Sequence, residues 1–434
     1  MSVVATSANG LAKKQFGKIN DDLPAWSILT DMVPFEEMAK TGQLFEELIT
    51  VSRSHGVTFA RSTRQTDYSL NAARSWVSQP AQATSSEIVM TERIAYGILA
   101  AAEAKGQKAY ESAIKLSLKS IATSSRFYQE YGYLYGGSGV ATGSNAGLGI
   151  SATAGASATT AQNYTITQAS WASGIWAQMK NAEVDCWDPT LVTKRNGTSP
   201  FIVTGITHST RIVTMTCATA ADADAVAVGD IFVPRGSRSG SGTGVAENCD
   251  GLDSILTNTG TLFALDAATY DVWAGNIKTA SSAPATILTL HGAMNLGVGR
   301  GLAGEFTWLV NNFVFQDLVD DTTALRRFTE DTKTSVTQGT MSLDFYGANN
   351  GVMRIISHPM VKCGDAMGIQ AKGFKRGGDT ELVRGLPGTP GEDFFYQVDG
   401  KAAVEIRNFS STFIMPTAPS HCVKLYNIAP RSAP

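Results

Sequence analysis

The stretch between residues 49 and 94 constrains the fold most, because it contains strand-like segments but little apolar surface to bury. Residues 49–51, 57–60 and 86–94 have the β-branched and aromatic content of strands. The residues between them are mostly polar and include Pro80. A two-stranded projection is only marginally stable on its own in water. We therefore expect this stretch to lie on another surface, either the rest of the chain or a partner chain.

Residues 1–48 are expected to form an arm. Pro24 and Pro34 interrupt any long helix, although residues 35–48 could form a short one. Because the segment has little to bury, a frayed terminus and an arm lying on a neighbouring subunit are equally good interpretations.

The clearest helix is predicted within residues 95–135. Tyr110, Ile114, Leu118 and Ile121 recur at helical spacing and form one apolar face. This spacing is typical of an amphipathic helix that packs on one side.

The composition changes after this helix. Residues 136–160 are mostly Gly, Ala, Ser and Thr, which is typical of a flexible linker. Strand-like runs at residues 201–206, 211–216 and 226–233 predict a small β unit. Helical and strand-like segments then alternate, which predicts an α+β fold. The later strand predictions are residues 306–310, 351–356, 393–398, 402–414 and 423–426, and the helix predictions are residues 283–297 and 313–328.

The composition also narrows the classes of function. Charged residues make up 17% of the 434-residue chain, which is below the soluble average. This fits surfaces buried in a permanent assembly, or long low-complexity loops. The formal net charge of -3 argues against a dedicated nucleic-acid binder. Five widely spaced cysteines fit reduced thiols, and we expect neither a signal peptide nor a transmembrane segment.

No arrangement of residues predicts a catalytic or cofactor site. Residues 299–304 match Gly-x-Gly-x-x-Gly, but a helical segment precedes them and a strand follows, which is the reverse of a dinucleotide site. The five histidines lack metal-ligand spacing, and no Gly-x-Ser-x-Gly sequence occurs. We therefore expect no enzyme activity, no cofactor and no bound metal.

The order of several segments resembles the major capsid proteins of tailed bacteriophages, which share the Hong Kong 97-type fold. The segments that carry the resemblance are residues 251–256, 260–276, 307–312, 324–328, 355–362 and 403–408. Together and in this order they make a fairly specific match over most of the chain.

The resemblance implies a role for each part of the chain. The implied parts are an N-terminal arm (1–48), an extended β-hairpin loop (49–94), a peripheral domain with a long spine helix (95–190), a small β-rich insertion (191–250), an axial domain (251–375) and C-terminal strands that return to the peripheral domain (376–434). The place of the insertion within the subunit stays open.

In such a protein the expected contacts are between subunits. Candidate inter-subunit residues are Arg53, Arg61, Arg64, Arg74, Glu87, Glu92, Arg326 and Arg327. Candidate contacts to packaged DNA on the inner face are Lys13, Lys14 and Lys18. Some family members join subunits by an isopeptide bond from a lysine of the extended loop. Residues 49–94 contain arginines but no lysine, and arginine cannot act as that nucleophile, so we expect a non-covalent shell.

The resemblance further implies self-assembly into pentamers and hexamers of an icosahedral shell around double-stranded DNA. The implied partners are further copies of the chain, a portal and, in some shells, scaffolding or decoration proteins. The implied location is the virion, after assembly in the host cytoplasm and without a membrane. Two alternatives stay open: an encapsulin-like nanocompartment that holds protein cargo, and a secreted adhesin-type protein suggested by the Gly/Ser/Thr loops.

Overall fold

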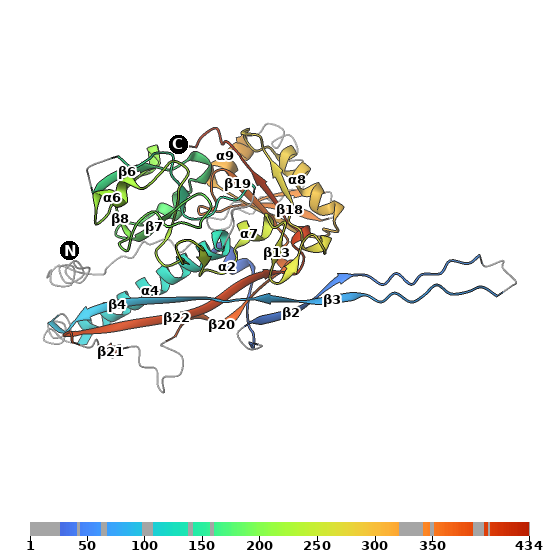
Figure 1. Cartoon of the computed structure of the whole chain (residues 1–434), viewed down its shortest axis with the longest axis horizontal. Helices are drawn as coiled ribbons and strands as arrows, with labels where there is room; N and C mark the ends of the chain where they lie inside the picture. Colours follow the sequence, from blue (N-terminus) through green and yellow to red (C-terminus); the bar gives the residue numbers. More distant parts are fainter. Residues whose placement is uncertain are drawn as a thin grey trace.

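The structure, a computed structural model, consists of a body and a long, thin projection (Figure 1). It describes residues 27–40, 44–61, 67–97, 107–137, 142–156, 160–320, 342–347, 351–384, 395–397 and 400–433. The body contains two large sheets with helices against them and a small β-barrel, so the predicted α+β class is confirmed.

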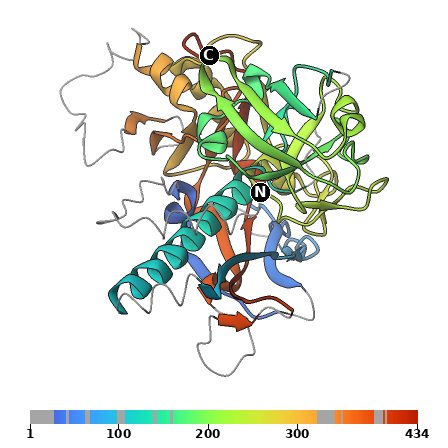
Figure 2. The same ribbon diagram turned by 90° about the vertical axis from the view of Figure 1, so that its left-hand side faces the viewer.

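A long sheet and a long helix form the lower part of the body (Figure 2). The helix is α4 (Gln107–Tyr135), which confirms the helix predicted within residues 95–135. Its residue Ile121 packs against Ile94 and Ile406 of the sheet. The sheet has the order β1-β20-β22-β21, with β4 also paired to β22. Its strands are β1 (Phe35–Glu37), β4 (Ser86–Ala95), β20 (Phe374–Arg384), β21 (Phe395–Gln397) and β22 (Ala403–Pro416).

Six antiparallel strands form a second unit, with the order β5-β10-β7-β8-β9-β6. They are β5 (Gly149–Ile150), β6 (Ala161–Thr165), β7 (Glu183–Trp187), β8 (Phe201–Thr207), β9 (Ile212–Thr216) and β10 (Ile231–Pro234). The two end strands also meet, because Thr167 N–H donates to the Ile150 carbonyl at 2.9 Å and Ser151 forms a bridge with Ile166. The sheet is therefore closed into a barrel. The rings of Tyr164, Phe201 and Phe232 meet one another inside it.

The barrel corrects two sequence predictions. Its strands begin at Gly149, so the insertion does not start at residue 191. The residues predicted to be a flexible linker contain buried Ala146 and Leu148. Their small size serves close packing instead: Gly147 has a φ of +74°, and a Cβ there would lie 2.5 Å from the Ile231 side chain.

The third unit is a six-stranded sheet of order β15-β23-β19-β16-β18-β17. Its strands are β15 (Ile277–Thr279), β16 (Phe306–Val310), β17 (Ser342–Tyr346), β18 (Val352–Ser357), β19 (Asp365–Ile369) and β23 (Val423–Tyr426). Helices α8 (Ile287–Gly299) and α9 (Asn312–Asp320) pack against it and share its apolar core. All five residues of β16 are buried, as expected for a central strand with a parallel neighbour. The last strand, β23, belongs to this sheet, whereas the preceding strands β20, β21 and β22 belong to the long sheet.

The projection consists of residues 45–61 and 67–83 of the described chain. Its regular part is a two-stranded antiparallel ribbon of β2 (Phe45–Ser52) and β3 (Val77–Ala83). Three predictions near it are wrong in detail. Residues 57–60 are not in a strand, and β4 belongs to the body instead of the extended loop. Residues 35–40 and 44–48 are not helical, and the short helix α2 (Ile28–Met32) lies before them. In these segments the secondary structure depends on pairing with distant strands, because such pairing overrides local propensity.

Candidate functional site

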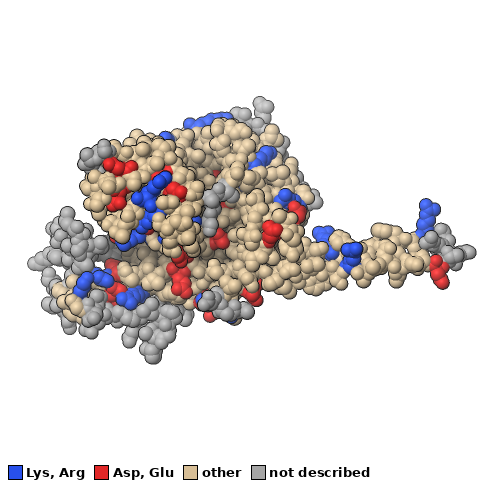
Figure 3. Space-filling model, in the orientation of Figure 1, with Lys and Arg blue, Asp and Glu red and all other residues tan. Residues whose placement is uncertain are grey.

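The projection exposes an unusual number of large apolar side chains for a segment in water. The exposed fraction of Phe59 is 91%, that of Leu70 is 77% and that of Trp76 is 56%. The other exposed apolar residues of the projection are Leu48, Val57, Tyr68 and Val77. Figure 3 shows that uncharged surface covers much of its length. Burying one such side chain stabilises a contact by about 1.5–3 kcal/mol, so a set of this kind marks an interaction surface.

The body holds the base of the projection firmly. The rings of Phe45 and Phe413 lie 4.8 Å apart, and Lys375 forms an ion pair with Glu47 at 2.6 Å. Gln82 N–H also donates to a carbonyl of the body at 2.9 Å. The base is therefore fixed in direction before any partner binds.

The two arms of the projection stay side by side beyond the regular strands. His55 N–H donates to the Arg74 carbonyl at 3.0 Å. Asn71 N–H donates to Thr58 Oγ1, and the Asn71 side chain donates to the Val57 carbonyl, both at 2.7 Å. This pairing presents the apolar residues on a preformed ribbon, which lowers the entropic cost of binding.

The predicted contact residues fall into three groups. Arg53, Arg61 and Arg74 are exposed on the projection, and their contact with another subunit stays a prediction. Glu87 is exposed and Glu92 is half-buried on β4, away from the projection. The remaining candidates lie outside the described residues; they are Arg64, Arg326, Arg327, Lys13, Lys14 and Lys18. The sequence interpretation missed the apolar residues of the projection, although Phe59, Leu70 and Trp76 in a polar segment were a visible signal.

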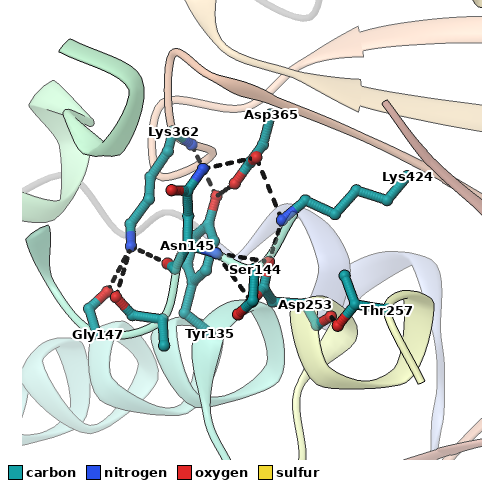
Figure 4. Close-up of polar contacts among 10 residues, drawn as sticks. Tyr135, Ser144, Asn145, Gly147, Asp253, Thr257, Lys362, Asp365 and Lys424 are labelled. Carbon is teal, nitrogen blue, oxygen red and sulfur yellow. Dashed lines mark hydrogen bonds and ion pairs between the residues drawn. The ribbon is translucent and has the colours of Figure 1, made fainter. Parts of the chain in front are cut away.

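A buried ionic cluster joins the parts of the body (Figure 4). Lys424 of β23 forms ion pairs with Asp365 of β19, at 3.2 Å, and with Asp253 of α7 (Leu252–Leu256). None of the three side chains is more than 2% exposed. Asn145, in the loop that leads into the barrel, donates its side-chain N–H to Asp365 at 2.8 Å and its backbone N–H to Asp253 at 3.2 Å. The cluster therefore fixes the barrel entry, α7 and the third sheet relative to one another.

Lys362 contributes a second cation to the same place, but its nearest partners are neutral. Its ammonium donates to the carbonyls of Asn145, Ala146 and Gly147 and lies 4.2 Å from the centre of the Tyr135 ring. Complete burial lowers the pKa of Lys362. Burial raises the pKa of Asp365, whereas the two neighbouring carboxylates outweigh burial and raise the pKa of Lys424.

Another buried carboxylate, that of Glu130, ties α2 to α4. Glu130 of α4 accepts from the backbone N–H of Leu29 at 2.6 Å and from the backbone N–H and hydroxyl of Thr30. Its fourth donor is His358 Nε2, at 2.9 Å. Since His358 Nδ1 accepts from Met360 N–H at 3.2 Å, the ring proton sits on Nε2. Glu130 thus caps the first turn of a helix that lies a hundred residues away in the sequence.

We expect Glu130→Gln to lower the free energy of unfolding by about 2–3 kcal/mol, because charge-assisted hydrogen bonds of this kind contribute about that much when buried. Urea unfolding measures the loss, and faster amide exchange at Leu29 and Thr30 reports the release of α2. Glu46→Gln is the matched control, since Glu46 is exposed and accepts from one side chain only. Equal unfolding midpoints for the two variants would contradict this role.

The described residues contain no group of three or more His, Cys, Asp or Glu side chains that could hold a metal ion. Within the same residues, no helix is both long enough and apolar enough to cross a membrane. The Gly-x-Gly-x-x-Gly sequence lies at the end of α8 and before β16, as expected for a turn.

Comparisons with known proteins give similarity in structure but not in sequence. No family model and no curated protein matches the sequence. The capsid asymmetric unit of cyanophage A-1(L) aligns with a TM-score of 0.52 and 9% identity, over 96% of this chain and 97% of that one. Two others align over at least 99% of both chains with lower TM-scores. They are the capsid of an empty GTA particle (0.46, 11% identity) and the SrpI encapsulin of Synechococcus elongatus PCC 7942 (0.41, 9% identity). The long helix on its sheet, the projecting ribbon and the full-length alignment with the cyanophage capsid together give the chain the Hong Kong 97-type capsid fold.

Proposed function

We propose that the chain is the major capsid protein of a tailed bacteriophage and builds a closed shell from copies of itself. The observation that carries this proposal is the projection, which is fixed at its base and exposes Phe59, Leu70 and Trp76 to water. No described residue of the same chain covers the apolar side chains of the projection. A second copy supplies that counterpart in every shell contact.

The contact made by the projection is head-to-tail. The ribbon of one subunit meets the body of the next, so the two surfaces are different, and such contacts close into rings. Interfaces of permanent assemblies bury about 2,000 Å² or more. At roughly 25 cal/mol per Å² of apolar area, the gross stabilisation is on the order of tens of kcal/mol before entropic costs. This is sufficient to hold a shell without covalent bonds.

The proposal extends to the rings, the contents and the partners of the shell. The rings are pentamers and hexamers of an icosahedral shell, and the unit with α8 and β16 is the axial domain that gathers at their centres. Double-stranded DNA is the content, and Lys13, Lys14 and Lys18 are the proposed inner contacts. A portal and scaffolding or decoration proteins are the proposed partners, and assembly takes place in the host cytoplasm. The protein needs no catalytic site for these tasks.

Negative-stain microscopy of the purified chain tests the proposal. We expect closed shells of uniform diameter at high protein concentration. A monomer at the same concentration, with the projection folded back on its own body, would rule the proposal out. Shells that retain a protein cargo and exclude nucleic acid would instead favour the encapsulin-like alternative.

We also expect the shell to be non-covalent. The projection offers arginines where an isopeptide bond would need a lysine, because residues 49–94 contain none. Denaturing gel electrophoresis of assembled particles should therefore show a single band at the mass of the monomer. A ladder of covalent multimers would show that another amine takes this role.

A further inference from the structure

Strand β4 forms one edge of the long sheet, and no other described strand pairs with its outer side. Among the described residues it pairs with β22 alone, over ten consecutive residues without a register shift. Exposed sheet edges are usually protected by bulges, prolines or short strands. The opposite edge strand, β1, has three residues, and β3 of the projection carries Pro80. Strand β4 is neither short nor interrupted by proline, and its charged side chains are the one such device that it has.

The direction of the free backbone groups follows from one hydrogen bond. Tyr96 N–H donates to the Ala402 carbonyl, on the β22 side, at 3.1 Å. Because hydrogen-bond direction alternates along a strand, the even-numbered residues of β4 face β22 and the odd-numbered ones face away. Glu87, Val89, Thr91 and Arg93 therefore direct their N–H and C=O groups outward, and all four are exposed.

These four residues are complementary to themselves in antiparallel order. If two β4 strands pair about a two-fold axis through Met90, Glu87 lies opposite Arg93 of the partner subunit and Val89 lies opposite Thr91 of the partner subunit. A shift by two residues in either direction removes both charge pairs. Opposite charges directly across a strand pair are favourable, whereas like charges are not.

The Arg93 side chain can bind a further carboxylate besides that of Glu405. Arg93 forms an ion pair with Glu405, whose carboxylate also binds Arg407. The Arg93 side chain is 46% exposed, and its guanidinium has donors left after its bond to Glu405. Glu87 has the opposite charge and is exposed.

We propose that β4 is a two-fold docking edge for a second copy of this chain, which pairs antiparallel through β4 in the register centred on Met90. The long sheets of two subunits then become one continuous sheet. In a shell, this isologous contact would join subunits of neighbouring rings, whereas the projection joins subunits within a ring. The pairing itself does not require a shell, because a free dimer contains the same contact.

Engineered disulfides test the register. At Met90 the two strands would form a non-hydrogen-bonded pair with Cα atoms about 4.5 Å apart, which a disulfide can span. We expect Met90→Cys to give a dimer under mild oxidation, and mass spectrometry should identify a peptide in which a disulfide joins position 90 of the two copies. Ile88→Cys is the matched control: its two copies would be four residues out of register, roughly 13 Å apart, and should not link.

Glu87→Arg in the Met90→Cys background tests the charge pairs. It places arginine opposite the partner's Arg93 twice per contact, so we expect the rate of disulfide formation to fall about tenfold. Glu37→Arg on β1, at the other edge of the sheet, should leave the rate unchanged. The proposal is overturned if the Met90→Cys variant forms no cross-linked peptide, if Ile88→Cys links equally well, or if Glu87→Arg has no effect. Because a soluble dimer suffices, these results are independent of whether shells form.

Discussion

Phe59→Asp combined with Leu70→Asp abolishes shell assembly and leaves the subunit folded. The two side chains are 91% and 77% exposed, so the isolated subunit gains no stability from them. In the assembled state each would contribute about 1.5–3 kcal/mol per contact, and a buried aspartate adds a desolvation cost. Every subunit in a shell repeats the contact, so a loss of this size prevents closure.

Light scattering and microscopy measure assembly, and thermal unfolding measures the fold. The melting temperature of the double variant should stay within about 2 °C of that of the parent, because surface changes away from packed sites have small effects. The conservative pair Phe59→Leu with Leu70→Met keeps the surface apolar and should still assemble. Normal shells from the aspartate variant would show that the projection is not the contact surface.

Lys424→Met lowers the free energy of unfolding by about 3–5 kcal/mol, because it removes one partner from a buried ion pair and leaves the other charge uncompensated. Of the described cations, Lys362 would then remain near Asp253 and Asp365, and its ammonium binds backbone carbonyls. Urea unfolding of the subunit measures the loss. Adding Asp365→Asn to Lys424→Met should recover part of it, since one buried charge then disappears with the other.

Lys375→Met is the matched control for this prediction. Lys375 also forms an ion pair, with Glu47, but its side chain is 32% exposed. Partly exposed pairs contribute about 0–1 kcal/mol, so the control should unfold close to the parent. If both variants lost the same free energy of unfolding, burial would not be the reason that the Lys424 ion pairs stabilise the fold.

The loss caused by Lys424→Met should also shrink at acid pH. Burial already raises the pKa of Asp365 to about 6, and Lys424 opposes this rise. Removing Lys424 raises the pKa of Asp365 in the folded state further above its unfolded value. The stability of the variant therefore falls more than that of the parent as pH rises above the unfolded pKa. The difference between variant and parent is therefore smaller at pH 5 than at pH 8. A difference that does not depend on pH would exclude Asp365 as its source.

Local pattern was enough to predict the elements that depend on their own residues. The apolar face that includes Ile121 predicted α4, and the strand-like run of residues 306–310 predicted β16 as the structure has it. Hydrophobic period and propensity act over neighbouring residues, so they are visible in the sequence. The absence of lysine from residues 49–94 is likewise visible in the sequence.

The candidate site was predicted only in part. The sequence placed Arg53, Arg61 and Arg74 on an extended segment, and the structure has them exposed there. It did not show that the second strand begins at Val77, because residues 57–60 have stronger strand propensity than the segment that pairs. Register depends on the partner strand and on the anchoring of the base, which residues far along the chain provide.

The sequence by itself determined elements whose own residues carry the pattern, such as α4 and β16, and that residues 49–94 have too little core to stand alone. Only the tertiary structure decided that β5–β10 close into a barrel, that β23 joins the third sheet, and that Lys362, Asp365, Lys424 and Asp253 share one buried site. The physical reason is distance along the chain: Asp253 and Lys424 are 171 residues apart, and a charge can be buried only where the fold brings its partner. No local pattern contains that information.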